Sequence, residues 1–250
     1  MNIGIIGFGH LGSALASGLV RSGVAGNGEL TVCDNSHAAL EAAKTPPINA
    51  VVSQDVNYII ENSKVVFLTV KKQAFEELAA AVDRSLLSGK IIVSFMAGVK
   101  FEEIYRLIGD VTLVRAMPSL AISTCEGVTG YTVAPPEVAD IFNKLGYAFE
   151  TEPDNIERVM AFSSCGLGFA AYLIDAFAEA GQTMGFSKEE AINIATATFR
   201  NAVDRGAYFE TVKAVATPGG ATEQGVLHMD DSGVYKIIAE AVNKAYKRMV

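Results

Sequence analysis

Residues 2–12, NIGIIGFGHLG, decide the fold expected of this chain. The apolar run Asn2–Gly7 is typical of a buried strand, and the glycines at its end have the spacing GxGxxG. Gly7 permits the tight turn, Gly9 lets the backbone approach a pyrophosphate, and Gly12 lets a following helix pack closely on the strand. The amino terminus of that helix presents free N–H groups to phosphates. The stretch predicts a dinucleotide-binding βαβ unit, and a glycine turn without a ligand is the alternative.

The predicted cofactor contacts of this loop are Gly7, Phe8, Gly9, His10, Leu11 and Gly12. A second strand ends at Asp34, whose carboxylate can accept hydrogen bonds from both ribose hydroxyls and repels a 2′-phosphate. Asn35, the next predicted contact, is followed by Ser36 and His37 rather than by Arg or Lys. This pattern favours NADH over NADPH. The alternative is that Asp34 caps the helix that follows.

The first half of the chain alternates short β-rich runs with helix-like segments. Most of the runs are continuously apolar, as expected for strands that are covered on both faces. The predicted strands are Asn2–Gly7, Leu30–Cys33, Val65–Val70, Ile91–Phe95, Leu113–Met117, Val128–Val133 and Tyr147–Thr151. Helices are predicted between them at Leu11–Ser22, Ser36–Ala43, Val56–Asn62, Gln73–Leu86, Phe101–Ile108 and Glu137–Leu145. This order predicts an α/β fold with a parallel, doubly wound sheet of Rossmann type.

From Pro153 the pattern changes to helices alone, so we predict a Rossmann domain at 1–152 and an all-helical domain at 153–250. Ser187 and Glu190 have capping-box spacing, and another helix is expected after Pro218-Gly219-Gly220. This half is rich in Ala and Gly and is too short and apolar to cover itself, which predicts packing against a second copy. A bundle within one chain is the alternative.

Composition argues against several other classes of function. The 250 residues carry a net charge of −8, which disfavours a nucleic acid or an anionic membrane as partner. The three cysteines and three histidines are isolated in the sequence, so neither disulfides nor a metal site are expected. The apolar stretch Val159–Ala180 contains Asp175, Glu179 and two glycines, which favours a buried helix over a membrane span. No signal peptide is recognised, and a cytoplasmic protein is expected.

Five segments, in this order, resemble the pyrroline-5-carboxylate reductase family. They are GFGHLG at 7–12, VKKQ at 70–73, AGV at 97–99, RAMP at 115–118 and PGGAT at 218–222. The resemblance covers essentially the whole chain. It implies an enzyme that reduces a cyclic imine carboxylate to proline with hydride from NAD(P)H. It also implies a Rossmann domain, a helical dimerisation domain and an active site at the dimer interface.

The residues of these segments suit that chemistry. Further predicted cofactor contacts are Val70, Lys71, Ala97 and Gly98, at the carboxyl ends of predicted strands, where open α/β sheets bind ligands. Gly219, Gly220, Ala221 and Thr222 open a helix whose N–H groups suit a substrate carboxylate. By resemblance, the Thr222 hydroxyl lies near the imine nitrogen and is the catalytic residue, and Met117 and Ser119 line the substrate side. The alternatives are a solvated strand end at Lys71 and an ordinary helix start at Pro218.

The chain departs from the family at Lys72, where Pro is usual, at Ser119-Leu120-Ala121, where Asn-Thr-Pro is usual, and at 163–169. These departures leave two rival hypotheses open: a reductase of another imine and a non-catalytic protein that reports redox state. A third rival is a β-hydroxyacid dehydrogenase, which also combines a Rossmann domain with helices. The absence of lysine from Gly166 to Gln182 counts against the dehydrogenase. Cys165 is interpreted as a small replacement for Ser rather than as a nucleophile, since hydride transfer needs no covalent step.

Overall fold

The computed structural model describes residues 1–26 and 28–249. Their contacts divide the chain into two compact units. The N-terminal unit is Met1–Ser164 with the chain from Tyr246, and the helical unit is Cys165–Ala245. The domain boundary predicted from the sequence, at residue 153, lies at the start of the helical run Pro153–Thr183, whereas the contacts divide the chain after Ser164. The domain boundary stays a prediction.

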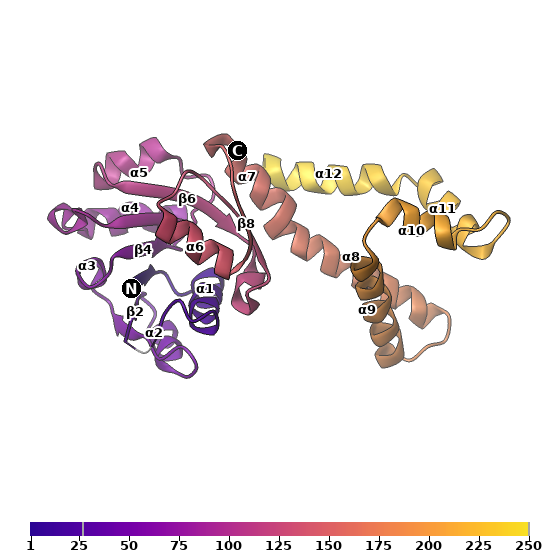
Figure 1. Ribbon diagram of the computed structural model, residues 1–250, viewed down its shortest axis with the longest axis horizontal. Helices are drawn as coiled ribbons and strands as arrows, with labels where there is room; N and C mark the ends of the chain where they lie inside the picture. The colour runs from indigo at the N-terminus through magenta and orange to yellow at the C-terminus, as the bar shows by residue number, and fades with distance from the viewer. Residues whose placement is uncertain (27, 250) are drawn as a thin grey trace. The chain divides into compact units, whose positions relative to one another are not determined.

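The N-terminal unit alternates strands and helices as the sequence predicts (Figure 1). Its strands are β1 Ile3–Ile6, β2 Leu30–Cys33, β3 Val51–Ser53, β4 Val65–Leu68, β5 Ile91–Ser94, β6 Thr112–Pro118, β7 Gly127–Tyr131 and β8 Gly146–Glu150. Its α-helices are α1 His10–Arg21, α2 His37–Lys44, α3 Val56–Glu61, α4 Lys72–Ala81, α5 Phe101–Ile108, α6 Pro136–Lys144 and α7 Ile156–Val159. Short 3₁₀ turns are η1 Arg84–Leu87, η2 Leu120–Thr124 and η3 Pro153–Asn155, and a π-helical turn, η4, spans Met160–Ser164.

The strands form one sheet in the order β3-β2-β1-β4-β5-β6-β7-β8. Neighbouring strands are parallel except β6 and β7, so the predicted parallel, doubly wound sheet is confirmed, with one antiparallel pair that the sequence did not predict. The physical reason is the connection. Only the turn η2 separates β6 from β7, whereas a parallel neighbour requires a crossover of a dozen or more residues.

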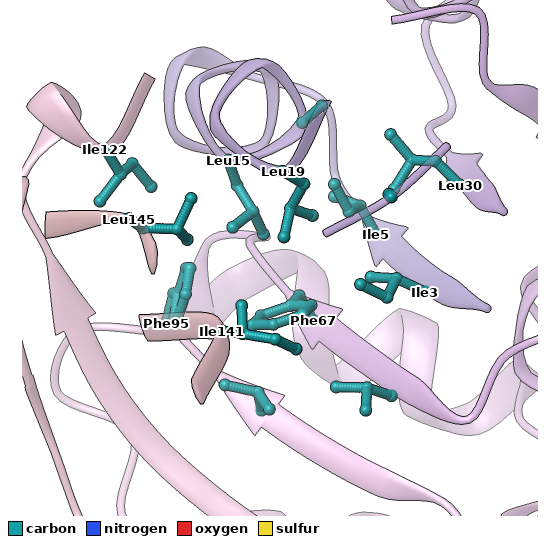
Figure 2. Packing of buried hydrophobic residues seen from close by; sticks show 14 of the residues in the cluster. Ile3, Ile5, Leu15, Leu19, Leu30, Phe67, Phe95, Ile122, Ile141 and Leu145 are labelled. Atoms are coloured by element: carbon teal, nitrogen blue, oxygen red, sulfur yellow. The ribbon is translucent and has the colours of Figure 1, made fainter. Parts of the chain in front are cut away.

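Two apolar layers cover the faces of this sheet, and side chains from one strand alternate between them. Ile3 and Ile5 of β1 and Phe67 of β4 pack with Leu15 and Leu19 of α1, as Figure 2 shows. Their strand neighbours, such as Ile6 and Leu68, point to the other layer. Burial on both faces explains why these strands are apolar at every position, as predicted.

Two predictions of local structure are wrong. The edge strand β3 was not expected, because it is three residues long and one of its faces is exposed. The helix predicted at Gln73–Leu86 ends at Ala81, and η1 follows. Val82 adopts an extended conformation, and the Asp83 carboxylate accepts the Ser85 backbone N–H at 2.9 Å, which starts a new turn.

The helical unit contains α8 Cys165–Thr183, α9 Lys188–Arg205, α10 Tyr208–Val215 and α11 Ala221–Asp231, and most of α12 Val234–Lys247. The predicted capping box is present: the Ser187 hydroxyl accepts from the Glu190 N–H, and the Glu190 carboxylate accepts from the Ser187 N–H. Within this unit the buried hydrophobic residues described are Ala178, Ala191 and Ala195.

The expectation of a buried helix at Val159–Ala180 is therefore not met within a single chain. By length and composition alone, the helical run Pro153–Thr183 could also cross a membrane. Tyr172, Met184, Tyr208, Phe209 and Tyr235 are all exposed in the helical unit. A unit with so little buried apolar surface cannot be a self-sufficient bundle.

Candidate active site

The glycine loop joins β1 to α1 at the carboxyl end of the sheet. Gly7 has φ +97°, a conformation that favours glycine, and its carbonyl accepts the Thr69 hydroxyl at 2.5 Å. A Cβ at Gly12 would overlap the Gly7 carbonyl oxygen, so only glycine lets α1 start this close to β1. A Cβ at Gly9, by contrast, would meet no heavy atom within 4 Å. The loop is thus tight where helix and strand meet and open where a ligand would approach.

The amino terminus of α1 is free to bind an anion. Gly9 is its N-cap residue, and it has no side chain to satisfy the first N–H groups of the helix. Those groups, with the positive end of the helix dipole, suit a phosphate. The loop therefore fits the pyrophosphate of a dinucleotide.

Asp34 links the glycine loop to the turn after β2. One carboxylate oxygen accepts the Phe8 backbone N–H at 2.6 Å, and the other accepts the Ser36 N–H at 2.8 Å. The N-cap of α2 is Ser36, whose hydroxyl accepts the Ala39 N–H. Asp34 therefore does not cap α2, and its carboxylate is held beside the glycine loop, where a ribose would lie.

A cavity of about 500 Å³ opens beside these residues. Six predicted cofactor contacts line it: Gly7, Gly9, Asp34, Asn35, Val70 and Lys71. Lys71 is exposed and is the N-cap residue of α4. It therefore follows β4 and lies at the cavity. Among the other predicted contacts, Phe8 is buried, His10 is the exposed first residue of α1, and Leu11 and Gly12 follow in its first turn. Ala97 and Gly98 follow β5, outside this cavity.

Sequence reasoning missed one wall of the cavity. The helix α4 lines it with Ala74, Glu77, Leu78 and Ala81. The segment from β3 to the start of α3 adds Gln54 and Val56. The α4 residues have the spacing of one helix face, so the signal was present in the periodicity of the helix. The apolar side chains of Val56 and Leu78 in the cavity lining suit contact with a flat aromatic ring.

Lys72, the departure from the family after β4, is not among the residues that line this cavity. Its Nζ lies 2.9 Å from a Glu103 carboxylate oxygen on α5. Lys72 thus joins α4 to α5 and does not alter the surface offered to a ligand.

Met117 and Ser119, predicted on the substrate side, are buried in the N-terminal unit. The Ser119 hydroxyl accepts the Val128 backbone N–H at 3.1 Å, which ties the end of β6 to β7. In the same segment, Arg115 makes a buried ion pair with Glu157 of α7 at 2.5 Å. The RAMP segment therefore joins the inner strand β6 to β7 and α7. Contact of Met117 or Ser119 with substrate stays a prediction.

The predicted substrate loop lies in the helical unit, at the start of α11. The Gly220 N–H donates to the Thr217 carbonyl, and the Gly219 N–H donates to the Glu223 carboxylate at 2.7 Å. The first two amides of the loop are therefore satisfied within the chain. Ala221 and Thr222 are the first residues of α11, so their N–H groups have no acceptor within the helix.

Comparisons with known proteins agree with this architecture. Residues 153–250 match the family model for pyrroline-5-carboxylate reductase dimerisation, and residues 2–98 match that for NADP oxidoreductase, coenzyme F420-dependent. Pyrroline-5-carboxylate reductase of Aquifex aeolicus is 29% identical over 99% of this chain and 96% of its own length. The chain is thus similar over nearly its whole length to pyrroline-5-carboxylate reductases.

Solved structures of pyrroline-5-carboxylate reductases have the same fold along the whole chain. The enzyme of Coxiella burnetii superposes with a TM-score of 0.86 at 25% identity, covering 99% of this chain and 97% of its own. The enzyme of Plasmodium falciparum, solved with NADP bound, superposes with a TM-score of 0.89 at 21% identity. The match covers 100% of this chain and 97% of the Plasmodium chain. Since the matched dimerisation domain includes the exposed apolar helices, this chain assembles with copies of itself.

Proposed function

We propose that this protein reduces pyrroline-5-carboxylate to proline with hydride from NADH or NADPH, as a cytoplasmic homo-oligomer. The observation that carries the proposal is similarity over nearly the full length to reductases of that name. The cavity beside the glycine loop supports it, because its open Gly9 and uncapped helix suit a dinucleotide. The proposed ligands are the residues predicted from the sequence, extended by the α4 wall.

For the substrate, we assign its carboxylate to the N–H groups of Ala221 and Thr222. Gly219 and Gly220 shape this loop, although their own N–H groups are engaged within the chain. Two amides at the start of an eleven-residue helix offer hydrogen bonds and a positive dipole end to an anion. They fix the ring so that its C=N bond can face the nicotinamide.

When bound, the reduced nicotinamide supplies the hydride that goes to the imine carbon. The protein has to orient the ring and supply one proton to its nitrogen, unless the imine binds already protonated. The Thr222 hydroxyl, beside the anion site, is the group assigned to that proton, directly or through water. A protonated iminium is already electrophilic, so a strong general acid is not needed.

The decisive experiment is an assay of NADH and NADPH oxidation with pyrroline-5-carboxylate. We expect turnover with both cofactors, and a Thr222→Ala variant that lowers kcat by at least about tenfold while NADH binding stays unchanged. Tight NADH binding with no turnover on any imine would instead identify a redox-reporting protein. Unchanged turnover of the variant would remove Thr222 from the mechanism.

We further propose that NADH is the preferred cofactor. Two carboxylates, Asp34 and Glu77, line the cavity together with a single ammonium group, Lys71. A 2′-phosphate near Asp34 would lie close to its negative charge, whereas ribose hydroxyls would donate to it. The ratio of kcat/KM values for the two cofactors tests this preference.

A second candidate substrate class is another cyclic imine. Leu120, which replaces a polar family residue, is half-exposed and lines a groove of about 310 Å³ with His10, Ser13 and Ser17. The departure therefore changes an accessible surface. Comparing turnover of five- and six-membered ring imines separates the two candidates.

A further inference from the structure

The cavity beside the glycine loop has further walls beyond those assigned to the pyrophosphate and the ribose. Gln54 and Val56 line it where β3 leads into α3, and α4 lines it with one face. The Gln54 side chain donates to the Asn35 carbonyl at 3.3 Å, which places these walls next to the turn that holds Asp34. A ribose at Asp34 carries its base within reach of them, so these walls are the ones offered to the base of a dinucleotide.

These walls suit a flat ring that makes one charged contact. On α4, Glu77 shares its face with Ala74, Leu78 and Ala81, at the spacing of one side of a helix. The two alanines are small and leave room, and Leu78 and Val56 offer apolar contact to the faces of an aromatic ring. A ring held by its faces differs from a similar ring only along its edge. Among these walls, Glu77 carries the charged side chain that can distinguish one edge from another.

The carboxylate of Glu77 is available for such a contact. Within residues 1–26 and 28–249, Glu77 is exposed and forms no ion pair or side-chain hydrogen bond, and Lys72 of the same helix is paired with Glu103 instead. A carboxylate accepts hydrogen bonds and donates none. Adenine presents an exocyclic amine at C6, which donates, whereas a 6-oxopurine presents a carbonyl oxygen there, which accepts. A carboxylate at this edge therefore favours adenine.

We propose that Glu77 accepts a hydrogen bond from the exocyclic amine of the cofactor's adenine and thereby selects adenine over a 6-oxopurine. The inference rests on the proposed function, since a dinucleotide has to occupy the cavity. Gln54 is the other polar side chain of these walls, but its amide carries an acceptor as well as donors and can serve either kind of purine. The discrimination is therefore assigned to Glu77.

Titration of reduced dinucleotides, followed by their fluorescence, tests the proposal. The probes are NADH and its reduced hypoxanthine analogue, in which a carbonyl replaces the exocyclic amine. We expect the unaltered protein to bind NADH at least about tenfold more tightly than the analogue, because a carbonyl facing Glu77 sets two acceptors against each other. In Glu77→Gln this ratio should fall to about threefold or less, because an amide can donate to the carbonyl.

Glu76→Gln is the matched control, because Glu76 is exposed on the same helix and does not line the cavity. Its ratio of affinities should equal that of the unaltered protein. An unchanged ratio in Glu77→Gln, or equal affinities of the unaltered protein for the two dinucleotides, would overturn the assignment to Glu77. The second comparison needs no variant, so it decides the matter even if Glu77→Gln fails to fold. Binding of neither dinucleotide to the unaltered protein would instead refute the proposed function, and this inference with it.

Discussion

At the scale of single residues, Asp34 both holds the glycine loop and lines the cofactor cavity. Its carboxylate accepts two backbone N–H groups, and this fixes it beside the glycine loop. We expect Asp34→Asn to lower kcat/KM for NADH by about tenfold or more, because the ribose hydroxyls lose a charged acceptor. The value for NADPH should fall less, because the repulsion of the 2′-phosphate is removed.

Steady-state kinetics with both cofactors measure this change. Glu41→Gln is the control, since it removes an exposed carboxylate on α2 that does not line the cavity. An equal loss with NADH and NADPH would mean that Asp34 acts through the structure of the loop alone.

We expect the buried thiol of Cys33 to make the free energy of unfolding fall at alkaline pH. Burial, and then the nearby Asp34 and Asp55 carboxylates, raise the pKa of its thiol from 9.0 to about 11. Below pH 9.0 the thiol is protonated in both the folded and the unfolded chain. Between that value and about 11 the unfolded thiol ionises first, so the free energy of unfolding falls as pH rises, by at most about 3 kcal/mol.

Urea denaturation across this range should give a shallower fall for Cys33→Ala than for the unaltered protein. The comparison isolates one thiol, because lysines and tyrosines titrate alike in both proteins. Parallel curves would show that Cys33 does not contribute.

At the scale of elements, two glycines where β1 meets α1 have different roles: Gly12 allows the helix to pack on the strand, and Gly9 allows the ligand to approach. Gly9→Ala adds a methyl group that meets no heavy atom within 4 Å, so Tm should hold while NADH binds at least about tenfold more weakly. Gly12→Ala drives a methyl group against the Gly7 carbonyl and should cost about 1–3 kcal/mol. Calorimetry gives Tm and titration gives affinity. A stable Gly12→Ala protein, or a Gly9→Ala protein with normal affinity, would contradict this division.

What the sequence could predict follows from how local each signal is. The β1–α1 turn was predictable, because glycine spacing and strand polarity are both properties of consecutive residues. The strand β3 and the direction of β7 were not, because a three-residue edge strand buries little and strand direction depends on the length of a connection. The shared helix face of Glu77 and Leu78 was readable from their spacing, but the sequence did not show that α4 turns this face to the cavity.

At the scale of the whole molecule, the cofactor loop and the predicted substrate loop belong to different compact units. Because the helical unit buries so little of its own apolar surface, assembly is a condition of its stability. The same assembly determines whether one site draws on one chain or on two. A mixture of two inactive variants distinguishes these arrangements.

We expect the two loops of one active site to come from different chains. Gly9→Asp should abolish cofactor binding by repelling the pyrophosphate, and Thr222→Ala should abolish most turnover. Co-refolded in equal amounts, they form mixed dimers in which one site carries both changes and the other carries neither. Half of the dimers are mixed, so about one quarter of the activity of the unaltered protein should return. Each variant refolded alone is the control. If the mixture is no more active than the controls, each site is built within a single chain.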